Sequence, residues 1–117
     1  MRLNDVSYGD GTPIDGYGPL GFRIAGTLHP GAVFVRPGGV VAWGGYDDAA
    51  TLLAAADDID VLLLGTGAEI AAIPDTLRRR LEDAGIGVEI MGTGPACRTY
   101  NVLLGEGRRI GAALLTV

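Results

Sequence analysis

Short apolar runs separated by glycine-rich turns fill the first part of the chain, residues 1–46. The runs lie at 22–24, 32–36 and 40–43. A Pro-Gly-Gly sequence at 37–39 separates the last two runs, and it is typical of a hairpin turn because proline presets φ and glycine accepts a positive φ. More than half of the twenty glycines lie in this part. The pattern predicts an antiparallel β layer.

From residue 47 onward the pattern changes to alternating helices and strands. Asp47 and Asp48 can cap a helix over 49–56, because their carboxylates accept hydrogen bonds from free N–H groups and suit the positive end of the helix dipole. An unbroken apolar run at 61–64 then predicts a strand that is buried on both faces. Pro74 is better placed to start a helix than to lie inside one.

The next expected elements are a helix whose main segment is 75–83, with Gly85 as its C-terminal cap, and a strand over 87–91. A helix from Pro95 to about 104, with Thr93 or Gly94 as its cap, and a last strand over about 109–115 complete the chain. The strands at 61–64 and 87–91 form a βαβ unit with the helix between them, so they should be parallel and end at the same edge of one sheet. We predict a single α/β domain, 1–117, with three layers: a mixed, largely parallel central sheet with helices, and the N-terminal antiparallel β layer. A chain of this length suits one domain.

The charge balance argues against a nucleic-acid partner. All nine basic residues are Arg, and fourteen acidic residues give a net charge of −5. Nucleic-acid binding draws most of its non-specific affinity from basic groups that neutralise phosphates. The basic run at 78–80 is flanked by acidic residues on an expected helix, so we interpret it as an ordinary solvent-exposed face of that helix.

The cysteine content and the N-terminus favour the cytoplasm. Cys97 is the single cysteine, so no internal disulfide can form and a reducing compartment is expected. Residues 1–5 lack the apolar run of a signal peptide. No stretch approaches the roughly 20 apolar residues of a membrane span, so we expect none.

Two identical Gly-Thr-Gly tripeptides, 65–67 and 92–94, form the best candidate site. Each follows a strand of the βαβ unit, and open α/β sheets bind ligands at the carboxyl ends of their strands. Glycine lets backbone N–H groups approach a ligand closely, and each threonine adds a hydroxyl. The second tripeptide also leads into a helix, whose N-terminus attracts anions.

Three side chains in the first turns of that helix extend the candidate site. Arg98 offers a bidentate positive charge, and Cys97 would have its thiol pKa lowered by the helix N-terminus and the neighbouring Arg98. Asn101 shares their side of the helix. Each feature also has a structural interpretation: turn glycines, an inert buried thiol, and an ion pair of Arg98 with Glu89 or Glu106. The expected ligand-binding residues are Gly65, Thr66, Gly67, Thr93, Gly94, Cys97, Arg98 and Asn101.

Other chemistries lack the residues they need. Ile70 stands where a dinucleotide-binding fingerprint requires its third glycine, and without lysine there is no Walker A loop. One histidine, His29, and one cysteine are too few ligands for a zinc site. A nucleophilic Cys97–His29 pair would require the fold to join distant segments. We therefore expect no metal and no cofactor, and we assign no catalytic residue.

The chain also carries a family resemblance. In its second half the resemblance lies in the residues at 64–67, 91–93, 96–104 and 106–109, and in its first half at 14–18, 22–24 and Trp43. These residues resemble the Mth-type domain family, which includes the mitochondrial respiratory complex I assembly factor 3 and the adipogenesis-associated Mth domain-containing protein. The resemblance covers about 3–115.

The resemblance implies a three-layer fold around a mixed, largely parallel sheet and no established catalytic residue. Its mitochondrial member implies an assembly role through protein contact. We expect no N-terminal targeting extension in this chain, so a mitochondrial location is not carried over.

Three hypotheses of function follow. The first is a non-enzymatic binding or assembly factor with a protein partner, which the missing catalytic set and the resemblance favour. The second is a small anionic metabolite-binding protein or enzyme that uses the crevice at 65–67 and 92–98. The third is a homo-oligomer, because the antiparallel layer leaves a sheet edge that must be covered or paired.

Overall fold

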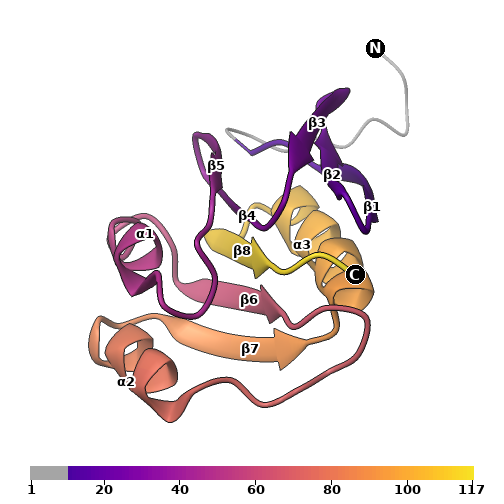
Figure 1. The fold of residues 1–117 in the computed structure, drawn as a ribbon. Helices are drawn as coiled ribbons and strands as arrows, with labels where there is room; N and C mark the ends of the chain where they lie inside the picture. The colour runs from indigo at the N-terminus through magenta and orange to yellow at the C-terminus, as the bar shows by residue number, and fades with distance from the viewer. Residues whose placement is uncertain (1–10) are drawn as a thin grey trace.

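The computed structural model describes residues 11–117, which form two β-sheets and three helices (Figure 1). The expectation for residues 1–5 lies outside this range. The larger sheet has the strand order β5-β4-β8-β6-β7 and the smaller the order β1-β2-β3. The strands are β1 (Ile14–Gly18), β2 (Gly21–Ile24), β3 (Thr27–Pro30), β4 (Val33–Arg36), β5 (Gly39–Ala42), β6 (Val61–Gly65), β7 (Gly87–Met91) and β8 (Ile110–Leu114), and the helices are α1 (Ala49–Leu53), α2 (Asp75–Asp83) and α3 (Thr93–Gly105).

The central sheet is mixed in the way the sequence predicts. β6 pairs in parallel with both β7 and β8, whereas β4 pairs antiparallel with β8 and with β5. β4 therefore runs against the other four strands. The predicted α/β fold, with a largely parallel central sheet and an N-terminal antiparallel layer, is confirmed, and β6, α2 and β7 form the predicted βαβ unit.

The hairpin at β4 and β5 is confirmed, but it extends the central sheet and does not join the antiparallel layer. Arg36 pairs with Gly39 around the turn, and Val33 pairs with Leu114 of β8. Val33, Phe34 and Val35 are all buried. A strand that buries both its faces needs cover on both sides, which only the central sheet provides.

Two hydrophobic cores lie on opposite faces of the central sheet. Side chains alternate along β6, so Leu62 and Leu64 enter one core and Leu63 enters the other. The first core also holds Leu52 of α1 and Leu77 of α2, whereas the second holds the residues that α3 and the three-stranded sheet contribute. The molecule is therefore layered as helices, sheet, and a mixed layer of α3 with β1–β3.

Local signals set two of the helix ends. The Asp48 carboxylate caps α1 by accepting hydrogen bonds from the Thr51 hydroxyl (2.7 Å), the Gly44 N–H (2.9 Å) and the Thr51 N–H (3.2 Å), which lower the pKa of that carboxyl. Gly85 follows α2 with a φ of +87°. The Ile86 N–H donates to the Leu81 carbonyl (3.1 Å) across that turn, which closes the helix as predicted.

Two other helix boundaries differ from the prediction. α1 ends at Leu53, and residues 54–58 form turns in place of the rest of the expected helix. α3 begins at Thr93, two residues before Pro95, with Gly92 as its cap. The Thr93 N–H donates to the carbonyl of Gly67, a residue distant in the sequence (2.8 Å). This long-range bond fixes the start of α3, so the local pattern around Pro95 could not reveal it.

Candidate functional site

The two Gly-Thr-Gly tripeptides lie side by side at the carboxyl ends of β6 and β7, where the sequence placed them. Gly65 pairs with Met91 across the two strands. The Thr66 N–H donates to the Met91 carbonyl (2.9 Å), and the Thr93 N–H donates to the Gly67 carbonyl (2.8 Å). The polar groups of the tripeptides are thus turned toward one another.

The Thr93 hydroxyl forms the centre of this junction. The residue is fully buried. Its Oγ1 donates to the Leu115 carbonyl (2.7 Å), just after β8, and accepts from the Gly67 N–H (2.9 Å). One side chain on α3 therefore holds the loop after β6 and the end of β8.

The Thr66 hydroxyl serves its own loop. Its Oγ1 donates to the Glu69 carbonyl (2.7 Å) and accepts from the Ala71 N–H (3.0 Å). These bonds shape the connection that runs toward α2. Both threonine hydroxyls are therefore engaged within the protein.

Close packing explains the glycines at this edge. A Cβ at Gly65 would lie 2.9 Å from Thr93 Oγ1, and a Cβ at Gly94 would lie 2.5 Å from Tyr17 Oη. Gly67 has a φ of +103°, which L side chains rarely adopt. These glycines let α3 approach the sheet and let Tyr17 lie over its first turn.

The N-terminus of α3 offers less to an anion than the sequence suggested. Gly92, Thr93 and Gly94 are all buried. The Thr93 N–H is bonded to Gly67, the Ala96 N–H to Gly92 (3.0 Å), and Pro95 has no N–H. Anion binding at a helix start relies on free N–H groups, and most of those here are engaged or missing.

Asn101 holds strand β1 against α3. Its Oδ1 accepts a hydrogen bond from the Ile14 N–H (2.8 Å), and its Nδ2 donates to the Ile14 carbonyl (2.9 Å). The carboxamide thus occupies the place that a neighbouring strand would take along this edge of β1. Its two polar atoms serve the attachment of the antiparallel layer.

Cys97 is buried, with 3% of its surface exposed. Burial raises the pKa of the Cys97 thiol to about 11, and the opposing effect of Arg98 is smaller. The expected lowering of this pKa is therefore wrong. Because α3 starts at Thr93, Cys97 lies past the first helical turn, where the helix dipole has little effect.

Arg98 is exposed and lines a small groove between α3 and β1, together with Cys97 and Asn101. The groove has a volume of about 220 Å³, and its β1 side is lined by Ile14, Asp15, Gly16 and Tyr17. No ion pair within residues 11–117 includes Arg98, so the pairing considered with Glu89 or Glu106 does not form there. The structure thus groups Cys97, Arg98 and Asn101 at one groove.

The other expected site residues do not line this groove. Gly65, Thr66, Gly67 and Thr93 belong to the junction between the strand ends. Gly94 lies between the two groups, because a Cβ there would be 3.5 Å from Arg98 Nη1.

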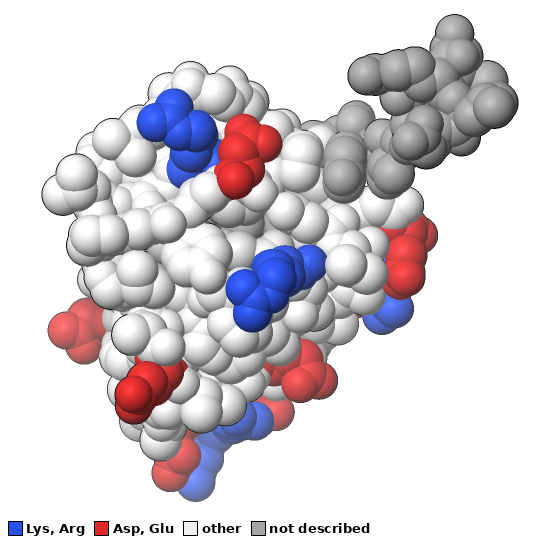
Figure 2. Space-filling model, turned by 90° about the vertical axis from the view of Figure 1, so that its right-hand side faces the viewer, with Lys and Arg blue, Asp and Glu red and all other residues white. Residues whose placement is uncertain are grey.

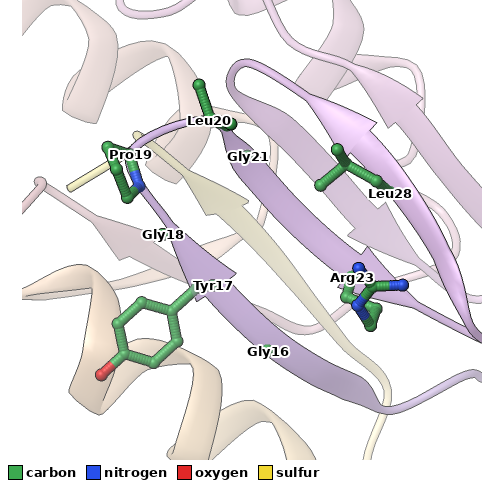
Figure 3. Close-up of a pocket in the computed structure, with 8 residues that line it drawn as sticks. All are labelled: Gly16, Tyr17, Gly18, Pro19, Leu20, Gly21, Arg23 and Leu28. Carbon is green, nitrogen blue, oxygen red and sulfur yellow. The ribbon is translucent and has the colours of Figure 1, made fainter.

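A larger hollow, which the sequence did not reveal, lies on the outer face of the three-stranded sheet (Figure 3). Its volume is about 400 Å³, and its lining includes Gly16, Gly18 and Gly21. Leu20 and Leu28 border it with 75% and 48% of their surfaces exposed. We call this hollow the glycine groove. The signal in the sequence was the alternation of glycines in 14–18, which places them on one face of a strand.

Two further findings limit the chemistry of residues 11–117. No group of three or more His, Cys, Asp and Glu side chains in this range could hold a metal ion. None of its helices is long and apolar enough to cross a membrane. The face in Figure 2, which is the right-hand side of Figure 1, is mostly uncharged, with scattered basic and acidic side chains.

The fold is shared with solved structures of bacterial proteins. An outer membrane protein from Bartonella henselae superposes with a TM-score of 0.83 at 40% identity, covering 92% of this chain and 96% of that one. A protein from Bordetella pertussis, described as a Mth938-like domain, superposes with a TM-score of 0.77 at 28% identity, covering 98% and 92%. The class of the protein is therefore an Mth938-like α/β domain.

Sequence comparison gives the family. Residues 14–115 match the model of a protein family of unknown function, DUF498/DUF598, and the chain belongs to this family. An uncharacterized protein of Rhodobacter capsulatus is 48% identical over 115 residues, which cover 98% of this chain and 93% of that protein. The NADH dehydrogenase (ubiquinone) 1 alpha subcomplex assembly factor 3 of Danio rerio is 35% identical over 112 residues, or 90% of this chain. The match spans only 64% of the Danio rerio protein.

We predict that the Cys97 thiol reacts slowly with a thiol reagent such as dithionitrobenzoate at pH 7. Its pKa is raised from 9.0 to about 11, and only the thiolate attacks, so two pKa units lower the reactive fraction about 100-fold. The rate should rise as the pH increases toward 11. The reference is a Val102→Cys variant, because Val102 is 61% exposed on the same helix. Equal labelling of the two thiols at pH 7 would contradict the buried state of Cys97.

Proposed function

We propose that this protein is a non-enzymatic binding protein that assists the assembly of a respiratory NADH dehydrogenase by contacting a protein partner. The observation that carries the proposal is the similarity to relatives named as assembly factors of that enzyme, which extends over 90% of this chain in the case of Danio rerio. Those relatives are longer, so the role of their whole length is transferred here as a hypothesis. We place the role in the cytoplasm, as the single cysteine suggests.

The geometry of the sheet edge supports a binding role over a catalytic one. A nucleophile has to be activated by a nearby base or by a lowered pKa. The Cys97 thiol has a raised pKa, and the hydroxyls of Thr66 and Thr93 are bonded to backbone groups within the protein. These residues serve the fold, which leaves the exposed surface to carry the function.

The first test is a capture experiment in a host that makes both this protein and an NADH dehydrogenase. We expect the affinity-tagged protein to recover subunits of the enzyme reproducibly, and we expect deletion of its gene to lower the amount of assembled enzyme on native gels. A Glu82→Ala variant is a suitable control, because Glu82 is an exposed residue of α2. It should behave as wild type.

Recovery of no protein above background in repeated captures, together with normal enzyme levels after the deletion, would contradict the assembly role.

The groove at Arg98 supports a second candidate function, the binding of a small anionic metabolite. Its volume of about 220 Å³ lies below the range of roughly 300–1,000 Å³ typical of ligand pockets. Arg98 is the basic side chain of its lining, and Asp15 places a carboxylate in the same lining. The groove therefore suits a small anion poorly, although Arg98 could form a bidentate contact with one.

A thermal-shift screen with anionic metabolites and nucleotides separates the two functions. A native-state ligand present at 100 times its Kd adds about 2.7 kcal/mol to the free energy of unfolding. We expect neither wild type nor Arg98→Ala to shift, with Arg79→Ala on α2 as the control for loss of a surface arginine. A shift in wild type and in Arg79→Ala that is lost in Arg98→Ala would replace the assembly role with metabolite binding.

A further inference from the structure

Gly16 and Gly18 of β1 are glycines that the fold itself does not require. A Cβ at either position would meet no atom within 4 Å, and neither residue has a positive φ. Of the glycines whose surroundings the structure describes, only these two combine open space with an ordinary φ. Gly21, their neighbour on β2, is different, because a Cβ there would overlap the His29 carbonyl oxygen and its φ is +151°.

The irregularity in β1 does not explain the glycines either. The register between β1 and β2 shifts between Ile14 and Gly16. A bulge that requires glycine places it in the left-handed region, and Gly16 does not lie there. Glycine within a strand weakens the strand, and it often marks a place where a ligand or another backbone approaches closely.

Strand pairing places the bare positions together on the outer face of the sheet. Gly16 pairs with Arg23, and Gly18 pairs with Gly21. The pair between these two, Tyr17 and Phe22, faces the other side of the sheet, where Phe22 is fully buried. The outer face of β1 and β2 thus has a floor without side chains at Gly16, Gly18 and Gly21, where Gly16 and Gly18 are partly exposed and Gly21 is buried. Figure 3 shows this floor between the labelled side chains.

The rim of the glycine groove is apolar on two sides and basic at one point. Leu20 is the most exposed large apolar residue in the described range, and Leu28 is half exposed on β3. Arg23 is the one charged residue of the lining. Its Nη1 donates to the Gly26 carbonyl (3.3 Å), which holds the guanidinium beside the floor, and within residues 11–117 its other donors form no hydrogen bond.

We propose that the glycine groove binds an extended segment of a partner protein, whose backbone lies on the Gly16–Gly18 floor. Apolar side chains of the segment contact Leu20 and Leu28, and a carboxylate of the segment faces Arg23. This inference rests on the proposed role in protein contact, and it assigns that contact to one surface. It goes further by giving the partner a chemistry: extended, apolar and acidic.

Charge favours such a segment over the other occupants. The chain has a net charge of −5, which opposes contact with a broad anionic membrane surface, whereas one carboxylate in a short segment interacts mainly with charges within about 8 Å, the Debye length at physiological salt. If two copies of the chain met groove to groove, the two Arg23 side chains would face each other. The groove lining contains no carboxylate that could pair with them. An acidic segment pairs with Arg23, and an extended backbone uses the space that a side chain at Gly16 or Gly18 would occupy.

The test uses a random linear peptide library displayed on phage and selected on the wild-type protein. We expect enrichment of peptides that combine apolar residues with Asp or Glu. In ¹⁵N NMR spectra, one enriched peptide should shift the amide signals of Gly16, Gly18 and Gly21. Replacing both floor glycines, Gly16→Ala with Gly18→Ala, should weaken this peptide at least about tenfold. The double variant should melt at the same temperature as wild type or higher, since the added methyl groups meet open space.

Two matched controls separate the floor and the charge from general effects. Gly87→Ala adds a methyl group to a strand of the central sheet, where a Cβ would lie 3.5 Å from the Asp60 carbonyl oxygen, and should leave binding unchanged. Arg23→Glu should weaken acidic peptides, whereas Arg79→Glu on α2 should not.

Three results would overturn the proposal: no enriched peptides, equal binding by the double alanine variant, or unfolding of that variant, which would show that the fold needs the glycines. Amide shifts confined to other surfaces would place the peptide outside the groove and would also overturn the proposal. Concentration-dependent dimerisation that is lost in the double variant would assign the groove to a second copy of the chain. If NADH dehydrogenase subunits are captured equally well by the double variant, the assembly role stands and the groove is excluded. If peptides bind the groove and no subunits are captured, the groove stands and the assembly role fails.

Discussion

The buried hydroxyl of Thr93 is the contact on which the arrangement of the whole sheet edge depends. It joins the start of α3 to the loop after β6 and to the end of β8, with hydrogen bonds of 2.9 and 2.7 Å. Gly65 is confined to glycine by the same close approach, because a Cβ would collide with Thr93 Oγ1. Once α3 is fixed, Asn101 on its surface can hold β1 through Ile14. The antiparallel layer is therefore positioned by a chain of contacts that begins at Thr93.

Because of this arrangement, the strand ends serve as a structural junction. In an open α/β sheet they are the expected place for a ligand, and the repeated Gly-Thr-Gly sequence strengthens that expectation. Here both threonine hydroxyls and the amides around Gly67 are used to join secondary-structure elements to one another. An accessible apolar surface lies on the other layer, around Leu20 and Leu28.

Local patterns in the sequence were sufficient to predict most of the fold. The apolar run at 61–64, Pro74 and Gly85 each act through neighbours in the chain, so β6 and both ends of α2 could be predicted. The start of α3 depends on Gly67, and the place of β4 depends on β8. Those contacts are formed between distant segments, and no local pattern encodes them.

The candidate site was predicted less well for the same reason. The spacing of Cys97, Arg98 and Asn101 predicted that they share one side of a helix, and they do line one groove. Their chemistry depended on burial, which raised the thiol pKa, and on Ile14, which engaged the carboxamide. The glycines at 16 and 18 could be noticed in the sequence, but only the structure shows that no atom of residues 11–117 fills the space next to them.

The most direct measurement is the free energy of unfolding of Thr93→Val in urea, compared with Thr99→Val, the same substitution at a partly exposed position of α3. If Thr93 joins the strand ends, valine leaves the Gly67 N–H and the Leu115 carbonyl without their partner. The free energy of unfolding should then fall by about 2–4 kcal/mol more than in the control. Equal stability of the two variants would contradict a structural role for this hydroxyl, and it would return the strand ends to consideration as a ligand site.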